Sequence, residues 1–162
     1  MVGTLHLQEI LRFTQDDNNI SKMINIIVNS DPKYPISKLG IQATVLDILK
    51  QHRVHGNLEI GVTVVGDRQM HEINKKFRGQ DATTNILSFP LDDASSSSSS
   101  NLQHIPKVGF VKAPDKVLRL GDILISYPQI LKDAALEGVS VEEELRFLVE
   151  HGTRHLLGIH HD

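Results

Sequence analysis

Four of the nine histidines in this 162-residue sequence fall within its last twelve residues. His151 and His155 are four positions apart, a spacing that places two side chains on one face of a helix, one turn from each other. Gly158 follows where a helix can end in a left-handed turn, which would let the chain fold back and offer a third imidazole. Three imidazole nitrogens around one ion, with a fourth position left to water, are typical of a catalytic zinc site.

The third ligand has two candidates, because His160 and His161 are adjacent. Spacing alone does not distinguish them. The sequence contains no cysteine, so any metal must be held by histidine, aspartate or glutamate side chains.

The same pair of histidines could belong to a metallopeptidase. In the HExxH motif of such enzymes a glutamate follows the first histidine and acts as the general base. Gly152 stands at that position here and carries no carboxylate. The sequence therefore disfavours peptidase chemistry of this type.

The composition is that of an ordinary globular protein, with 40% hydrophobic and 23% charged residues. The formal net charge of -3 gives no overall attraction to a polyanion, so nucleic-acid binding would need a local basic patch. No apolar run approaches the roughly 20 residues of a membrane span. The N-terminal segment lacks the apolar stretch of a secretory signal, and we expect a cytoplasmic protein.

Several elements are expected to position the histidines. Strands are predicted at 24–28, 58–65, 84–89 and 118–126, the last two as possible neighbours. Helices are predicted at about 37–51, from Asp67 as N-cap to Gly79, at 127–136, and from a capping box at Ser140 into the histidines. Because strands and helices do not alternate strictly, the expected fold is α+β, with a small mixed four-stranded sheet packed with helices.

One domain is expected over residues 21–162. Residues 1–20 are weakly patterned and are predicted to be an N-terminal extension outside the main fold, or at most one short helix. Six consecutive serines, Ser95 to Ser100, cannot bury apolar surface, and we expect a disordered insertion at about 92–117.

Three motifs in order resemble the YbeY family of metal-dependent endoribonucleases. The first is His151-Gly-x-x-His155-Leu-x-Gly158-x-x-His161, the second runs from Asn74 through Arg78, Gly79, Asp81, Thr84 and Asn85 to Ser88-Phe89-Pro90, and the third is Leu120-Gly-Asp-Ile123. The resemblance covers about Ile24 to Asp162. It implies that His151, His155 and His161 are the metal ligands, which favours His161 over His160, and that His151 and His155 also belong to the catalytic site.

Arg78 is the third catalytic residue that the resemblance implies. A guanidinium can bind two phosphate oxygens at once, but basic residues near a helix end are commonly only solvated, and the sequence alone favours that plainer interpretation. We place Arg78 on a loop after the helix. Thr84, Asn85 and Ser88 could bind substrate or complete turns, and Asp122 could orient a ligand histidine or cap the neighbouring loop.

The resemblance implies a hydrolase: a single-strand-specific endoribonuclease with one Zn²⁺, acting in ribosomal RNA processing. Single-stranded RNA, and ribosomal RNA in particular, is the expected partner, with the ribosome or its proteins as further candidates, and neither DNA nor a membrane is expected. Two alternatives stay open: a peptidase-like metal hydrolase, and a metal-stapled RNA- or ribosome-binding module without catalysis. The sequence departs from the family pattern at Arg154, where the family has Leu, and at His160, where it has Asp.

Overall fold

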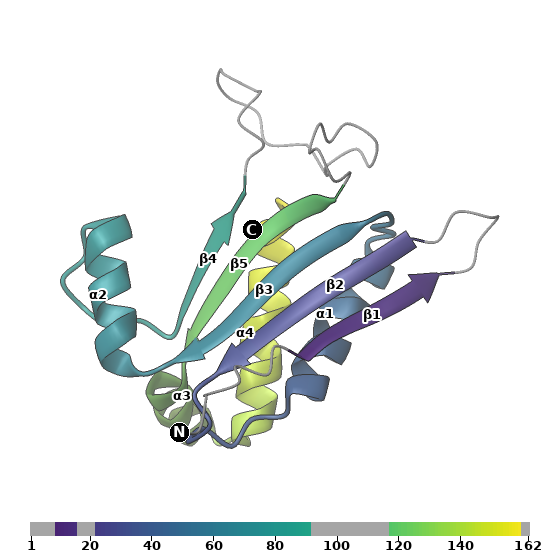
Figure 1. Ribbon diagram of the computed structural model, residues 1–162. Helices are drawn as coiled ribbons and strands as arrows, with labels where there is room; N and C mark the ends of the chain where they lie inside the picture. The colour runs from purple at the N-terminus through teal and green to yellow at the C-terminus, as the bar shows by residue number, and fades with distance from the viewer. Residues whose placement is uncertain (1–8, 16–21, 92–116, 160–162) are drawn as a thin grey trace, which may run out of the picture.

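The computed structural model describes residues 9–15, 22–91 and 117–159 (Figure 1). The elements are β1 (Glu9–Gln15), β2 (Lys22–Ser30), α1 (Lys38–Gln51), β3 (Leu58–Val65), α2 (Asp67–Arg78), β4 (Ile86–Pro90), β5 (Leu118–Ser126), α3 (Tyr127–Glu137) and α4 (Val141–Leu156). The strands form one mixed sheet in the order β1-β2-β3-β5-β4. Strands β2, β3 and β5 are parallel, and β1 and β4 pair antiparallel at the two edges. The expected α+β class is confirmed.

The N-terminal strand corrects one prediction. The four expected strands are all present, and Glu9–Gln15, expected to lie in an extension or a short helix, forms a fifth strand. It pairs with β2 in a register that sets Ile10 opposite Ile27. Without β1, β2 would be an edge strand with unpaired backbone groups, and these bind an extended segment whose own pattern is weak. Tertiary pairing, rather than local sequence, therefore decides this element.

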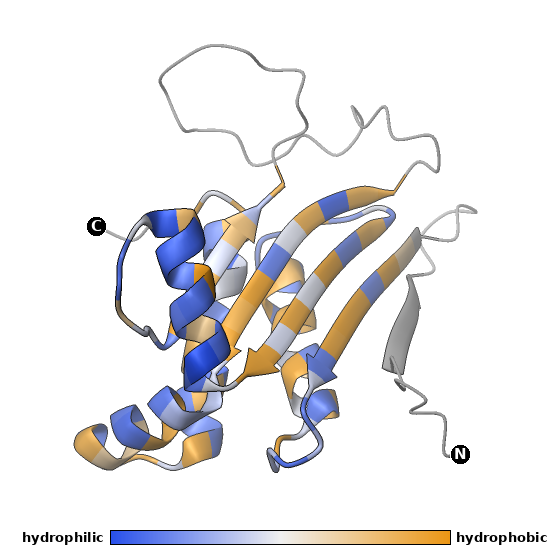
Figure 2. Cartoon of the chain, turned by 60° about the vertical axis from the view of Figure 1, so that its left-hand side comes forward, coloured by the Kyte–Doolittle hydropathy of each residue, from blue (hydrophilic) through white to orange (hydrophobic). Residues whose placement is uncertain are grey.

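The sheet has one face covered by helices and one largely open. Along β3 every second side chain is buried, and hydrophobic and polar residues alternate along the strands (Figure 2). The buried side chains, such as Ile60 and Val62, pack beneath α1 and α4 (Figure 1). At roughly 1.5–3 kcal/mol for each fully buried aliphatic side chain, this layer is the main stabilising contact of the fold.

Helix α2 packs on the opposite face, at the β4 edge. Its Met70 is fully buried in a small second cluster with Val65 and Leu87, and Phe89 and Leu124 pack against that cluster. Because neighbouring residues of a strand point to opposite faces, α2 and α4 contact different side chains of β4 and β5. The two helices therefore lie on opposite sides of the β4 edge.

The helix ends follow the predicted chemistry, with one exception. Gly79 and Gly138 end α2 and α3 with φ of 68° and 69°, a left-handed conformation that glycine adopts without strain. The capping box at Ser140 is present. Asp67, predicted as an N-cap, is instead the first residue of α2, and Gly66 is the cap. The carboxylate of Asp67 binds side chains across the fold rather than its own helix.

Other predictions stay untested. Almost all of the serine-rich insertion, and both His160 and His161, lie outside the described residues. The single domain predicted for residues 21–162, with its boundaries, stays a prediction. None of the described helices combines the length and hydrophobicity that crossing a membrane requires.

Candidate active site

Helix α4 carries the two described histidines at its C-terminal end. The Ser140 side chain accepts a hydrogen bond from the Glu143 backbone (3.1 Å), and the Glu143 carboxylate accepts one from the Ser140 backbone (2.8 Å). The Ser140 backbone N–H is the largest of the influences that lower the pKa of Glu143. Leu148 and Val149 anchor the next turns in the core. The last turns are thereby held rigidly against the sheet.

The expected arrangement of His151 and His155 is confirmed. Their ring centroids are 4.5 Å apart, and the rings are tilted by 46°. One turn earlier, the ring of Phe147 stacks on His151 at 6.3 Å with an angle of 18° between the planes. Three ring side chains thus follow one another along one side of α4. The sequence analysis missed Phe147, although its i, i+4 spacing to His151 was a readable signal.

The pair has the geometry and chemistry of half a metal site. At a Zn–N distance of about 2.0–2.1 Å, two imidazole nitrogens on one tetrahedral ion are about 3.3 Å apart, which rings with centroids 4.5 Å apart can achieve. His151 is exposed and His155 partly exposed. The described residues alone contain no group of three metal-binding side chains. The spacing of His151 and His155 is therefore compatible with two ligands of one metal ion.

Gly152 lies where α4 packs so closely on the sheet that there is no space for the glutamate of a HExxH motif. A Cβ at this position would lie 3.0 Å from side-chain carbons of both Ile86 and Ile123, because α4 approaches the sheet closely here. Position 152 therefore points into the core, and a glutamate there would meet the sheet. The structure gives the HExxH mechanism no base at this position.

Glu150, which directly precedes His151 in the sequence, has an ion-pair partner. Glu150 lies 3.6 Å from a guanidinium nitrogen of Arg154, as an i, i+4 pair along α4. Both side chains are about one quarter to one third exposed. Arg154, which departs from the family pattern, thus pairs with the acidic residue that directly precedes His151 in the sequence.

Arg78 lies at the end of α2, as its last residue, rather than on the following loop. The side chain is exposed, and the part of the chain that the structure describes holds no ion-pair partner for it. The C-terminal ends of α2 and α4 both point toward the end of the sheet where β4 finishes (Figure 1). Arg78 therefore belongs to the helix that packs on one face of β4, and His151 and His155 belong to the helix that packs on the other.

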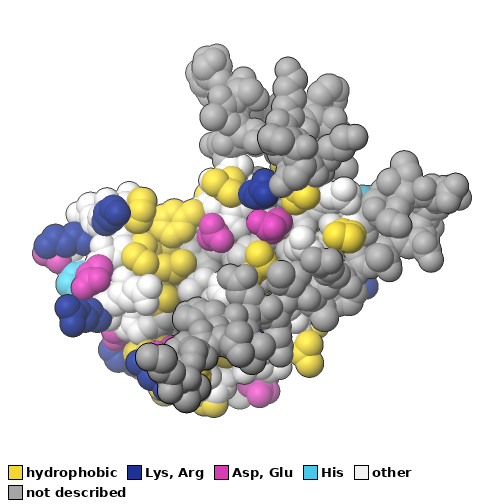
Figure 3. Space-filling model, viewed as in Figure 1, with side chains coloured by type: hydrophobic (Ala, Val, Ile, Leu, Met, Phe, Trp, Pro, Cys, Tyr) yellow, Lys and Arg dark blue, Asp and Glu magenta, His cyan; other side chains and the backbone are white. Residues whose placement is uncertain are grey.

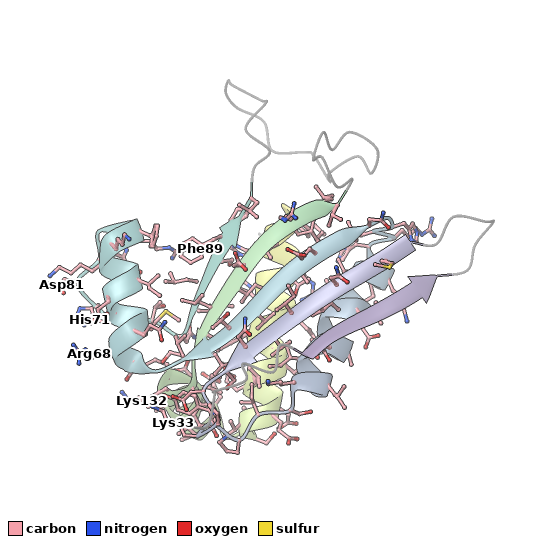
Figure 4. All side chains as sticks on the ribbon, viewed as in Figure 1. Lys33, Arg68, His71, Asp81, Phe89 and Lys132 are labelled. Carbon is pink, nitrogen blue, oxygen red and sulfur yellow. The ribbon has the colours of Figure 1, made fainter. Side chains whose placement is uncertain are left out.

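The turn after α2 is fixed by polar side chains. Asp81 accepts from His71 (2.7 Å) and from Lys75 (2.9 Å), and these bonds, that of Lys75 foremost, lower the pKa of Asp81. The amide of Asn74, which is buried, donates to the carbonyl of Ala82 (2.7 Å). His71 and Asp81 lie on the outer side of α2 (Figure 4). These contacts hold the helix end that carries Arg78.

Asp67 makes the densest set of polar contacts at the β4 edge. Its carboxylate accepts hydrogen bonds from the hydroxyls of Ser126 (2.7 Å) and Thr83 (3.2 Å). Both of its oxygens also accept from Nε2 of Gln129, at 2.8 and 2.9 Å. Partial burial acts to raise the pKa of Asp67, but these hydrogen bonds, with Lys132 nearby, outweigh it and lower the pKa. The sequence analysis saw only a helix cap here, since these partners lie up to 62 positions away.

The remaining motif residues divide between the two faces. Asn85 donates to Asp133 (2.9 Å), which joins the start of β4 to α3. Asp122 is paired with Phe89 across β4 and β5 and therefore faces the open side of the sheet. There it lines a cavity of about 250 Å³ with Glu59 and Arg119. Helix α4, which carries His151 and His155, packs on the other face, and a role of Asp122 in orienting a ligand histidine stays a prediction.

Comparison with known proteins identifies the family. The family model "Endoribonuclease YbeY" matches residues 26–162. The chain is 38% identical over 122 residues to an endoribonuclease YbeY of Roseiflexus castenholzii, covering 75% of this chain and 69% of the relative. It is 33% identical over 138 residues to an endoribonuclease YbeY of Dehalococcoides mccartyi, covering 85% and 80%.

A solved structure has the same fold. The solution structure of TM1509 from Thermotoga maritima matches with a TM-score of 0.52 and 23% identity, covering 85% of this chain and 75% of that chain. The match supports the fold alone. The sequence matches confirm the resemblance first seen in the three motifs, and the chain belongs to the endoribonuclease YbeY family.

Proposed function

We propose that this protein is a zinc-dependent endoribonuclease that cleaves single-stranded RNA in the course of ribosomal RNA maturation in the cytoplasm. The observation that carries the proposal is the pair of imidazoles 4.5 Å apart at the end of α4, in a chain of the endoribonuclease YbeY family. Ribosomal RNA is the proposed substrate, and the ribosome or its proteins are the proposed partners.

His151, His155 and His161 would hold the ion. When bound, zinc would lower the pKa of a coordinated water toward about 7 and polarise a phosphoryl oxygen. The stacking of Phe147 on His151 limits the rotation of that imidazole, and the close packing at Gly152 fixes the helix turn from which both rings project. The chain thereby orients its ligands in advance, which reduces the free-energy cost of binding the ion.

Arg78 would bind the phosphodiester. Its guanidinium stays charged at any physiological pH and can donate two parallel hydrogen bonds to phosphate oxygens. As negative charge grows on those oxygens in the transition state, such a donor stabilises the transition state more than the bound substrate. The contacts of Asp81 and Asn74 support this role because they hold the end of α2 in place.

Metal removal and restoration test the proposal. The protein is treated with a chelator, dialysed, and assayed on a single-stranded RNA and on the same RNA annealed to its complement. We expect no cleavage without metal, recovery on adding one equivalent of Zn²⁺, and cleavage of the single strand only. Cleavage that is unaffected by the chelator would contradict the assignment of a metal site.

The products distinguish the nucleophile. A 2′,3′-cyclic phosphate end would show that the RNA 2′-hydroxyl attacks first, whereas a linear phosphate formed without it would show attack by water. A protein that binds RNA and zinc but leaves the RNA intact would instead be the binding module without catalysis.

A further inference from the structure

An aromatic side chain stands exposed at the end of α2. Met70, Ile73 and Phe77 form one stripe along the helix, and Met70 is fully buried while Phe77 is 61% exposed. The stripe therefore begins in the core and ends in solvent. Packing against the sheet accounts for Met70 and Ile73 but leaves most of the Phe77 ring uncovered.

The ring of Phe77 is held in place by a second aromatic side chain. Its centroid lies 5.4 Å from that of Phe89, with the rings inclined at 65° in an edge-to-face contact. Phe89 itself packs against the small cluster around Leu87 and lies on the side of β4 that faces α2 (Figure 4). Phe77 thus has a rigid support beneath it and an accessible ring above.

Basic residues flank Phe77 in the sequence. Between Asn74 and Asp81 the chain carries three cations, Lys75, Lys76 and Arg78, against the single carboxylate of Asp81, in a protein whose net charge is -3. The ammonium of Lys76 lies 5.2 Å from the centre of the Phe77 ring. Figure 3 shows Lys and Arg side chains along the outer side of α2, beside a hydrophobic area that borders the strands.

We propose that Phe77 is a stacking platform for one unpaired base of the RNA substrate, with Lys76 and Arg78 binding the phosphates on either side of that base. The inference rests on the proposed function and deepens it, since it names how the substrate is held. A base within a duplex is already stacked on its neighbours and cannot cover the ring. The platform therefore selects single-stranded RNA.

The surface around Phe77 differs in charge from a second exposed apolar surface, at Leu136 and Phe147. Leu136 and Phe147, 83% and 61% exposed, border a cavity of about 540 Å³ that is also lined by Asp133, Glu137, Glu143 and Glu144. Burial, followed by the charges of Asp133 and Glu137, raises the pKa of Glu144. The cations beside Phe77 attract an RNA backbone, whereas the carboxylates that line the cavity beside Leu136 do not.

The test is RNA binding by variants of Phe77. A fluorescent single-stranded oligoribonucleotide is titrated with each protein in EDTA, so that no cleavage occurs, and the dissociation constant is read from anisotropy. Phe77→Ala and Phe77→Leu should both weaken binding by about 5- to 150-fold, the range that one base stacked on an aromatic side chain provides. Phe77→Tyr should bind as the wild type does, and so should Leu136→Ala, a matched change at an exposed apolar residue of α3.

An abasic probe separates stacking from charge. On an oligomer that has ribose and phosphate but no bases, wild type and Phe77→Ala should bind equally. Lys76→Ala should weaken binding to both probes and should lower the slope of log K against log salt concentration by about 1. Phe77→Leu binding the ordinary oligomer as tightly as the wild type would overturn the proposal.

The remaining outcomes are equally decisive. If Phe77→Ala leaves RNA binding unchanged but abolishes a dimer seen by sedimentation, the surface is a protein interface and the proposal is wrong. Binding that depends on Phe77, in a protein that cleaves no RNA with metal restored, would support the platform and refute the proposed catalysis. Cleavage with binding that does not depend on Phe77 would refute the platform alone.

Discussion

The side-chain amide of Gln129 donates to both carboxylate oxygens of Asp67, at 2.8 and 2.9 Å. The two residues belong to different junctions of the fold, since Asp67 begins α2 directly after β3 and Gln129 lies in the first turn of α3 directly after β5. Ser126, the last residue of β5, donates to the same carboxylate. The carboxylate of Asp67 thus links two strand-to-helix junctions. The junction of β3 and α2 leads to Arg78, and the junction of β5 and α3 leads to α4.

Replacing Asp67 with Asn should destabilise the protein by about 1–2 kcal/mol at about pH 7, a value reduced for its partial exposure. The carboxylate has a lowered pKa in the folded protein, so its contribution is complete above the unfolded value of about 3.9 and is lost as the pH falls through the lower, folded value. The wild type should therefore lose its advantage over Asp67→Asn in strong acid.

Urea unfolding of both proteins at about pH 7 and pH 3 measures this difference. Asp31→Asn is the control, because Asp31 also has a lowered pKa, owing first to the Lys33 backbone, but is exposed and pairs only locally. It should change the unfolding free energy much less than Asp67→Asn. An equal effect of the two substitutions would show that the Asp67 contacts do not couple the two junctions.

Gly152→Glu would create the HExxH spacing of a metallopeptidase but should not create a peptidase. The new side chain would be driven against Ile86 and Ile123, and we expect a loss of about 3 kcal/mol or more in the free energy of unfolding. Leu136→Glu places the same side chain on the exposed surface of α3 and should be tolerated. A stable Gly152→Glu protein that digests casein would contradict the packing described for α4.

Arg78→Ala should reduce the rate of RNA cleavage by about 100-fold or more, as the loss of one donor to a developing anion does in other enzymes. Because Arg78 is exposed and far from the core, thermal stability and zinc content should remain at wild-type levels. Arg78→Lys keeps the charge but not the paired donors and should restore only part of the rate. Full activity of Arg78→Ala would remove this residue from the site.

Most helices and strands could be predicted from the sequence because hydrophobic periodicity and helix-capping residues lie within the element that they determine. β3 and β5 were predicted with the bounds that they have, and the glycines at 79 and 138 and the capping box at Ser140 acted as expected. The strand β1 was missed because its place depends on pairing with β2, which no pattern within residues 9–15 encodes. Edge strands of this kind are decided by tertiary contacts.

The candidate site shows the same division. The spacing of His151 and His155 fixed their common face, since four residues make about one helical turn. Which face of the sheet a residue occupies depends on the tertiary fold: Asp122 lies on the open face, opposite α4, and its role beside a ligand histidine stays a prediction. The contacts of Asp67 could not be predicted from the sequence because they join residues 59 and 62 positions apart.

The most direct test compares the wild type with His155→Ala, measuring RNA cleavage and bound zinc on the same preparations. His52→Ala, a change at the end of α1 on another part of the surface, serves as the control. We predict about one equivalent of zinc and cleavage of single-stranded RNA for the wild type and the control, and neither for His155→Ala. Equal zinc content and equal cleavage in His155→Ala would contradict the metal site at the end of α4.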